Sequence, residues 1–286
     1  MRWRRGRRSS NIEDRRGMRL GRGGVKLGGG TLIIVMVVGL LMGQDPLQLL
    51  GMLAGEGGLS GTSSPAPRRQ APQNNEDADF VSVILADTED TWNQLFASLG
   101  QKYHPATLVM FTDQVQSACG MNTAATGPFY CPPDRKVYID LGFFHELKNL
   151  GAPGDFARAY VLGHEIGHHI QNLLGTADKV HRAQQRGGKA QANALSVLLE
   201  LQADCYAGVW AHHANMQRNL LEAGDVEEGL NAAASIGDDR LLRKAGRRAS
   251  PESFTHGSSQ QRVYWLRKGL QTGEINSCNT FAATSS

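Results

Sequence analysis

The sequence predicts an α+β protein in which a small sheet precedes a set of packed helices. Two short apolar stretches, 107–112 and 136–141, have the composition of strands, whereas most of the chain after Phe144 has the 3.6-residue apolar periodicity of helices. Strands followed by a run of helices are typical of α+β folds. At 286 residues, 41% of them hydrophobic, the chain is long enough for one large domain or two small ones.

The individual elements follow from local patterns. The sequence predicts, in order, a helix over Phe80–Gly100 with Trp92, Leu95, Phe96 and Leu99 on one face, a strand over Thr107–Thr112, a loop over Gly120–Gly127, two extended pieces GPFYC and KVYIDL, the helix that carries H-E-x-x-H, and helices near Lys189–Ala214, Asp225–Ile236, Asp238–Lys244 and Ser258–Leu270.

Positive charge is concentrated at the amino terminus. The net charge is +3, but residues 1–26 carry ten Arg or Lys against Glu13 and Asp14, which leaves the remainder of the chain at −5. Such a tail can bind nucleic acid, or it can orient a membrane span from the cytoplasmic side. The stretch that follows favours the second interpretation, so we expect no nucleic acid among the partners.

An uncharged stretch follows the basic residues. From Leu27 to Gln44 there is no charged side chain, and 18 residues lie at the low end of what a bilayer crossing needs. We therefore predict a transmembrane helix over 27–48, a cytoplasmic tail over 1–26, and a domain that lies in the periplasm or outside the cell. A cleaved signal peptide is disfavoured because no A-x-A-like site closely follows. A buried core helix is disfavoured by the polar flanks.

The chain beyond the apolar stretch divides into a linker and a domain. Residues 55–79 are rich in Gly, Ser, Pro and polar residues and contain almost no large apolar side chain. This composition predicts a flexible linker over 49–79. The folded domain is then expected over 80–286.

The segment 161–172, VLGHEIGHHIQN, holds His164, Glu165 and His168 in an H-E-x-x-H arrangement within a helical apolar pattern. Positions four apart stand one above the other on a helix, so both imidazoles can face one metal ion. Two imidazoles suit zinc, and Glu165 is placed to take a proton from a zinc-bound water. His169 faces about 100° away from His168 and is not expected at the same metal.

A third ligand is offered by the sequence ELQAD. Glu200 follows His168 by 32 residues, on the next long predicted helix, and completes a two-histidine, one-glutamate site for a single Zn²⁺ with an open fourth position. Asp204, one turn later, is placed to accept the second ring N–H of His164. The alternative is that both acids are solvent-facing charges on an amphipathic helix.

These motifs resemble those of the gluzincin metallopeptidases, in which H-E-x-x-H is followed by a glutamate ligand within E-x-x-x-D. More narrowly, the chain resembles the bacterial family named "putative neutral zinc metallopeptidase" in its Arg-rich opening with SSNIEDRRG, its apolar span, and the pieces GPFYCPPDRKVYIDL, GHEIGHHIQ, ELQADCYAG and THGSSQQRVYWLRKG. The resemblance covers nearly the whole chain. It implies a membrane-tethered zinc peptidase domain.

Residues near the carboxyl terminus offer further candidates. His256, in THGSS, is a candidate second catalytic imidazole that donates to a developing oxyanion, although a plain helix-entry histidine fits equally well. Ser258 or Ser259 is expected to cap the last helix, and Arg262 is a candidate partner of a core carboxylate. The stretch GPFYC at 127–131 is either a purely structural strand or an edge on which an extended peptide lies.

All four cysteines follow the apolar span, and in an oxidising compartment an even number suggests disulfides. Cys119 with Cys131 closes a short loop and is the first pairing we expect. Cys205 is then left for Cys278. Zinc binding by these thiols is disfavoured because the chain has no C-x-x-C.

Three functions remain open at this stage. The first is a zinc metalloendopeptidase, with Glu165 as general base, that acts on peptides or proteins. The second is a non-catalytic, zinc-stabilised envelope domain that binds a partner protein. The third is a di-iron helix bundle, which requires a second E-x-x-H that this sequence lacks.

Overall fold

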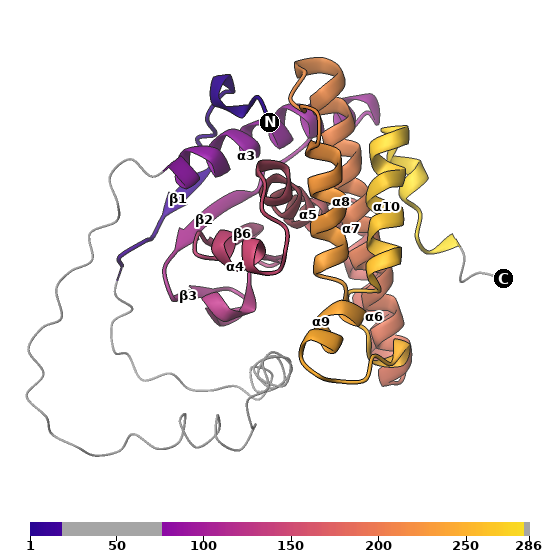
Figure 1. Cartoon of the computed structure of the whole chain (residues 1–286). Helices are drawn as coiled ribbons and strands as arrows, with labels where there is room; N and C mark the ends of the chain where they lie inside the picture. The colour runs from indigo at the N-terminus through magenta and orange to yellow at the C-terminus, as the bar shows by residue number, and fades with distance from the viewer. Residues whose placement is uncertain (19–75, 283–286) are drawn as a thin grey trace, which may run out of the picture.

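The computed structural model describes residues 1–18 and 76–282 (Figure 1). The transmembrane helix expected over 27–48 lies outside the described residues, as does the linker up to residue 75. Within the described ranges, no helix combines the length and the apolar character that a membrane crossing requires.

A four-stranded sheet forms one side of the molecule, with strand order β1-β2-β6-β5. Strands β1, β2 and β6 run parallel to one another, and β5 pairs antiparallel with β6 at the far edge. A separate hairpin follows β2. The strands are β1 (Ile12–Asp14), β2 (Thr107–Phe111), β3 (Gln114–Ser117), β4 (Gly120–Thr123), β5 (Phe129–Cys131) and β6 (Lys136–Asp140).

Helices make up most of the remainder. In Figure 1, α5 lies between the sheet and a bundle in which α7, α8 and α10 run side by side, and α3 lies above the sheet. The helices are α3 (Glu76–Ser98), α4 (Phe143–Asn149), α5 (Asp155–Leu173), α6 (Thr176–Arg186), α7 (Lys189–Arg218), α8 (Asp225–Ser235), α9 (Asp238–Lys244) and α10 (Ser259–Thr272). The predicted α+β class is therefore confirmed for the described residues.

The described part of the amino terminus, residues 1–18, belongs to the folded domain. A 3-10 turn at Trp3–Arg5 buries Trp3 to 2% exposure, and β1 forms an edge of the sheet. The sequence predicted a separate basic tail over 1–26 and a domain that begins at residue 80. That expectation is wrong for residues 1–18, because a strand of three residues is too short to show a strand pattern and its charged neighbours resemble a solvated tail.

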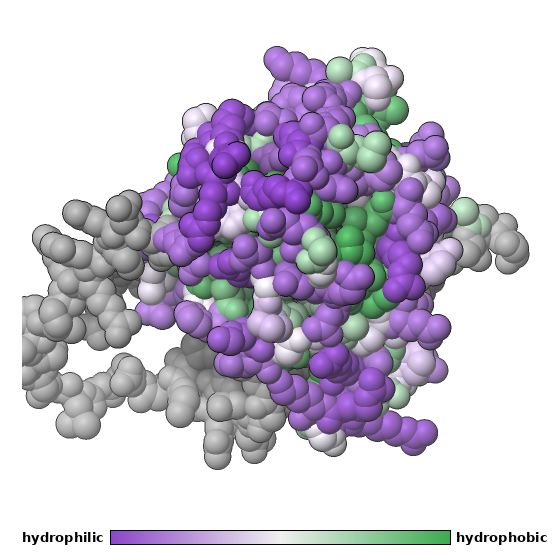
Figure 2. Space-filling view, turned by 45° about the horizontal axis from the view of Figure 1, so that its top comes forward, coloured by the Kyte–Doolittle hydropathy of each residue, from purple (hydrophilic) through white to green (hydrophobic). Residues whose placement is uncertain are grey.

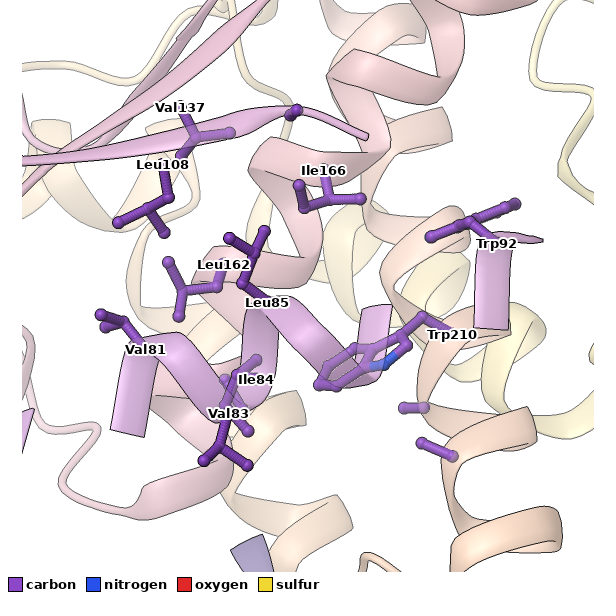
Figure 3. Packing of buried hydrophobic residues seen from close by; sticks show 14 of the residues in the cluster. Val81, Val83, Ile84, Leu85, Trp92, Leu108, Val137, Leu162, Ile166 and Trp210 are labelled. Atoms are coloured by element: carbon purple, nitrogen blue, oxygen red, sulfur yellow. The ribbon is translucent and has the colours of Figure 1, made fainter. Parts of the chain in front are cut away.

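The core brings the sheet, α3, α5 and α7 together. Figure 3 shows Leu108 and Val137 of the sheet facing side chains of α3, with Leu162 and Ile166 of α5 close by. The same cluster extends to Trp210 of α7. Helix α5 is therefore held between the sheet and α7, and this packing fixes the position of every side chain that α5 presents.

Two glycines allow the central helices to approach closely. A side chain at Gly167 would come within 2.8 Å of the carbonyl oxygen of Ala203, so α5 and α7 touch backbone to backbone there. A side chain at Gly269 would come within 2.0 Å of the carbonyl oxygen of Cys205, where α10 meets α7. Only a residue without Cβ fits at such contacts. These contacts set the separation of the three helices that carry the candidate site.

Both predicted disulfides are present. Cys119 is linked to Cys131 with Cα atoms 5.9 Å apart, and this bond ties the hairpin to β5. Cys205 is linked to Cys278, with Cα atoms 5.6 Å apart, and this bond ties the chain after α10 to α7. Each bond closes a loop in the unfolded chain and so stabilises the fold.

The sequence missed several short elements. The segment 120–127 was expected to be a loop, but it holds β4 and a 3-10 turn at Ala124–Thr126. Helices α4 and α6 were not predicted as separate elements. Helix α4 has only seven residues and α6 buries only Val180, so neither has the apolar stripe that identifies a helix from sequence.

The molecular surface is mostly hydrophilic, with a band of hydrophobic residues exposed between hydrophilic ridges in the view of Figure 2. A groove of about 410 Å³ lies where α7, α8 and α10 come together. Its apolar lining is formed by Ala211, Met216, Leu221, Val226, Leu230 and Leu270.

Candidate metal centre

Two helices bring three potential ligands together. The Nε2 atom of His164 lies 3.2 Å from Oε2 of Glu200, and Nε2 of His168 lies 3.4 Å from Oε1 of the same carboxylate. One ligand atom from each of the three residues lies within 4.8 Å of the other two. The close approach of α5 and α7 at Gly167, which stands between the two histidines, makes this convergence possible.

The donor set fits a zinc ion. Each imidazole Nε2 lies 3.2 or 3.4 Å from one oxygen of the Glu200 carboxylate, close to the roughly 3.3 Å that separates two donor atoms bound to a tetrahedral zinc at about 2.0–2.1 Å; His164 faces Oε2 and His168 faces Oε1. Two imidazoles and one carboxylate are also the ligand set of catalytic zinc sites that keep a fourth position open. The three residues can therefore hold one metal ion.

The outer nitrogens of both imidazoles are engaged by neighbouring acceptors. His164 Nδ1 donates to Oδ1 of Asp204 at 2.8 Å, since an ionised carboxylate can only accept. His168 Nδ1 donates to Oε1 of Gln171 at 2.9 Å, while Nε2 of Gln171 donates to the carbonyl of Leu199. In the neutral form of each ring, these bonds keep the proton on Nδ1 and leave the Nε2 lone pair directed toward Glu200. This tautomer is the one that metal binding needs.

Asp204 is itself fixed by two buried partners. It is fully buried and accepts from Nε and Nη2 of Arg262 on α10 at 2.8 and 2.9 Å, and from the hydroxyl of Tyr160 on α5 at 2.6 Å. Burial opposes the charge, but the Arg262 guanidinium and His164 lower the pKa of Asp204 to about 2. The prediction that Arg262 pairs with a core carboxylate is confirmed.

The local charge favours a cation. Burial opposes a proton on His164, yet the charge and hydrogen bond of Asp204, helped by Glu200, raise the pKa of its imidazole to about 10. Burial likewise opposes ionisation of Glu200, but His168 and His164 hold the pKa of its carboxyl well below the usual range. Carboxylates that stabilise a proton on these imidazoles also stabilise a metal ion in its place.

Glu165 differs from the other acids of the site. Its carboxyl is 7% exposed, and among the described residues it makes no side-chain hydrogen bond. Burial raises the pKa of this carboxyl, although the two histidines partly offset the effect. A buried carboxyl beside a metal site, with a raised pKa and no committed hydrogen bond, has the properties of a general base.

His256 is oriented by Asp238, the first residue of α9. The His256 Nδ1 donates to Oδ1 of Asp238 at 3.1 Å, and Oδ2 of the same carboxylate accepts the backbone N–H of His256 at 2.7 Å. Burial opposes protonation, but the hydrogen bond that the imidazole donates to Asp238 and the charge of Glu200 raise the pKa of His256. The ring is 46% exposed, so its other nitrogen is accessible.

Comparisons with known proteins agree with this geometry. Residues 1–281 match the family described as "putative neutral zinc metallopeptidase". The chain belongs to this family. It is 47% identical to "Uncharacterized protein YpfJ" of Escherichia coli over 98% of the chain and 99% of that relative. It is 38% identical to "Uncharacterized protein Rv2575" of Mycobacterium tuberculosis over 85% of each. No solved structure matches.

In this member of the family, His169 serves the fold. Its side chain is fully buried, with Nε2 donating to the carbonyl of His104 at 2.6 Å and Nδ1 lying 3.0 Å from the hydroxyl of Tyr130. Burial lowers the pKa of His169 to about 4. It therefore stays neutral and ties α5 to β5. This placement agrees with the expectation that it does not face the metal.

Two residues of the candidate site have no signal in the sequence. Asp238 and Tyr160 each fix a site residue through a contact that only the tertiary structure creates. Gln171 lies three residues after His168 on the same helix, so its contact follows from helical spacing. Gly167 carried a usable signal, because a glycine inside an otherwise regular helix indicates a close backbone approach. Ser258 caps α10 in a capping box with Gln261, as one of the two expected alternatives.

Proposed function

We propose that this protein is a zinc-dependent metallopeptidase that hydrolyses peptide bonds, with one Zn²⁺ held by His164, His168 and Glu200. The observation that supports it most is the convergence of two imidazole Nε2 atoms on one carboxylate while a separate acceptor holds each Nδ1. Family membership agrees with a hydrolase that uses zinc.

Each nearby side chain has a role in such a reaction. A zinc ion at this place would acidify a water molecule and polarise the carbonyl of a bound peptide. Glu165 would accept the proton of the attacking water and deliver it to the leaving amine, a task suited to its raised pKa. His256, oriented by Asp238, would donate a hydrogen bond to the developing oxyanion.

The sheet offers a place for the substrate. Strand β5 lies at one edge of the sheet, opposite the edge formed by β1. The hydroxyl of Tyr130 on β5 contacts His169 and Asn172 of α5. An edge strand next to the metal-bearing helix can pair with an extended peptide through its main chain, with little regard to most side chains. We therefore propose extended segments of peptides or proteins as substrates.

The two disulfides support a location outside the cytoplasm, because such bonds persist mainly in oxidising compartments. The uncharged stretch within 27–48 supports attachment to a membrane. We propose a membrane-attached peptidase that acts in the periplasm or outside the cell.

The decisive experiment compares metal content and hydrolysis for the purified full chain and three variants. Glu165→Gln should keep about one zinc per chain and lose cleavage of a mixed peptide library, read by mass spectrometry. Glu200→Ala should lose the metal. Glu146→Gln, an exposed acid on α4, is the matched control and should behave as the parent chain does.

Two results would overturn the proposal in different ways. Full turnover in Glu165→Gln would remove this residue from the reaction. Stoichiometric zinc in the parent chain without cleavage of any peptide would favour a non-catalytic, zinc-stabilised domain that binds a partner protein.

A further inference from the structure

The amino-terminal segment, residues 1–18, is bonded to distant parts of the chain. Strand β1 pairs in parallel register with β2, so that Ile12 stands beside Leu108 and Asp14 beside Met110. The Leu108 N–H donates to the carbonyl of Asn11 at 2.9 Å, and the Arg15 N–H donates to the carbonyl of Met110 at 2.8 Å. The segment thus supplies β1, an edge strand of the sheet.

Trp3 attaches the same segment to the core and to α5. Its ring is 2% exposed and packs edge-on against Phe80 with ring centres 5.2 Å apart. Its Nε1 donates to Oδ2 of Asp155, the first residue of the helix that carries His164 and His168, at 3.1 Å. The segment therefore contacts the element on which the metal site depends.

Several basic residues of the segment have acidic partners in the domain. Arg8 forms a two-pronged ion pair with Asp79, at 2.8 and 2.6 Å. Arg7 pairs with Glu89 at 2.9 Å and with Asp90 at 2.7 Å. These arginines were interpreted from the sequence as a signal that keeps the tail in the cytoplasm. The ion pairs give their positive charge a second explanation, because they hold the segment against α3.

Glu89 shows what the domain would lose without the segment. Its carboxylate is 4% exposed and takes hydrogen bonds from the Ser9 hydroxyl at 2.5 Å and the Asn11 amide at 2.8 Å, besides the Arg7 pair. A buried charge that loses such partners is strongly destabilising. With Trp3 and β1 removed as well, the domain would expose an apolar cavity and an unpaired sheet edge.

We propose that residues 1–18 and 76–282 form one folded unit on one side of the membrane. The stretch 27–48 is then not a single-pass transmembrane helix between them. One crossing would place about 30 Å of hydrocarbon between strands that lie roughly 5 Å apart. The family match from residue 1 to 281 agrees with a segment that belongs to the domain. This arrangement replaces the single membrane crossing between the amino-terminal segment and the domain that the sequence predicted.

Cysteine labelling in bacterial cells that express the full chain tests the proposal. Ser10→Cys and Ala97→Cys each place a thiol at an exposed position, one in the segment and one at the end of α3, while the native cysteines stay in disulfides. A membrane-impermeant maleimide is added to intact spheroplasts or, in parallel, after lysis, with a cytoplasmic thiol protein as the marker for leakage.

The two thiols should react alike, both before lysis if the unit lies outside the cytoplasm and both only after lysis if it lies inside. Reaction of one before lysis and of the other only after it would overturn the proposal. Neither readout depends on metal or on hydrolysis, so this test and the test of the peptidase function can fail independently.

Cross-linking in isolated membranes tests the contact itself. Arg8→Lys places an amine beside Asp79, where a carbodiimide should form an amide that links residues 8 and 79, detected by mass spectrometry after digestion. Arg5→Lys is the matched control, because Arg5 is equally exposed and is paired with no acid among the described residues. An Arg8→Lys yield no higher than that of the control would contradict the proposal.

Discussion

Two sets of ion pairs hold this molecule together, and they differ in burial. Around the metal site, Arg262 is 3% exposed and clamps the fully buried Asp204. Along the amino-terminal segment, Arg7 is 49% exposed and pairs with Glu89 from the solvent side. The chemistry is the same, but water screens only the second set.

This difference shows which contacts do which task. The buried pair fixes the ring of His164, because Asp204 cannot move without leaving a charge unpaired in the core. The exposed pairs can guide the segment to its place, but Trp3 and the pairing of β1 must supply most of its attachment. Four measurements test this difference between the buried and the exposed contacts.

The largest effect is expected for Arg262→Met. The methionine fills much of the space but leaves the Asp204 carboxylate buried without its cation, so the free energy of unfolding should fall by about 3–5 kcal/mol. Arg7→Met is the exposed counterpart and should cost about 1 kcal/mol or less. Urea unfolding of both variants measures the contrast, and equal losses would show that burial does not separate the two sets.

Trp3→Ala should come next. Removing a buried indole typically costs about 3–5 kcal/mol, and the lower end is expected here because the segment lies at the edge of the fold. Trp3→Phe keeps most of the apolar contact and loses only the hydrogen bond to Asp155, so about 1 kcal/mol is expected. If Trp3→Ala unfolded at the same urea concentration as the parent chain, the exposed ion pairs would have to carry the attachment.

Asp204→Asn should weaken metal binding as well as the fold, because it also leaves the buried Arg262 guanidinium without its carboxylate. The amide cannot hold the His164 Nδ1–H as a carboxylate does, so zinc affinity should fall about 10-fold to 100-fold. Competition with a chromogenic chelator measures the affinity, at a temperature at which circular dichroism shows both proteins folded. Asp178→Asn, an exposed acid on α6, is the control and should bind zinc as the parent chain does.

The smallest effect is expected at Glu13, which pairs with Lys136 across the sheet at 2.5 Å. The hydrogen bond from Lys136, with help from Arg15, lowers the pKa of the Glu13 carboxyl below its usual 4.5. The folded state therefore gains stability above pH 4.5 and loses that gain as pH falls through the lowered pKa.

Glu13 is 38% exposed, so solvent screening limits this gain to about 1 kcal/mol or less. Glu13→Gln should unfold more readily than the parent chain at pH 7, and the difference should shrink as the pH falls below 4.5. Thermal unfolding from pH 3 to pH 7 measures it. A difference that grew as the pH fell would have the wrong sign for this pair.

Local patterns were enough to find much of the site. His164 and His168 share a helix face because the helix backbone repeats every 3.6 residues, so two residues four apart in the sequence lie on the same face. The pairing of Asp204 with His164 was also expected. The two residues lie on two predicted helices that each supply ligands to the same metal site. Asp238 was not expected beside His256, because the contact joins the start of α9 to a loop that has no pattern of its own.

The sequence by itself determined the α+β class and the metal-binding motif, and it favoured the two disulfide pairings that the structure confirms. Only the tertiary structure decided that residues 1–18 complete the sheet. The reason is physical: periodicity within a helix is fixed by bonds between neighbours in the chain, whereas β1 joins β2 across more than ninety residues. A strand of three residues has no sequence pattern that predicts its pairing partner. The burial of Trp3 beside Phe80 instead holds the segment where β1 can pair with β2.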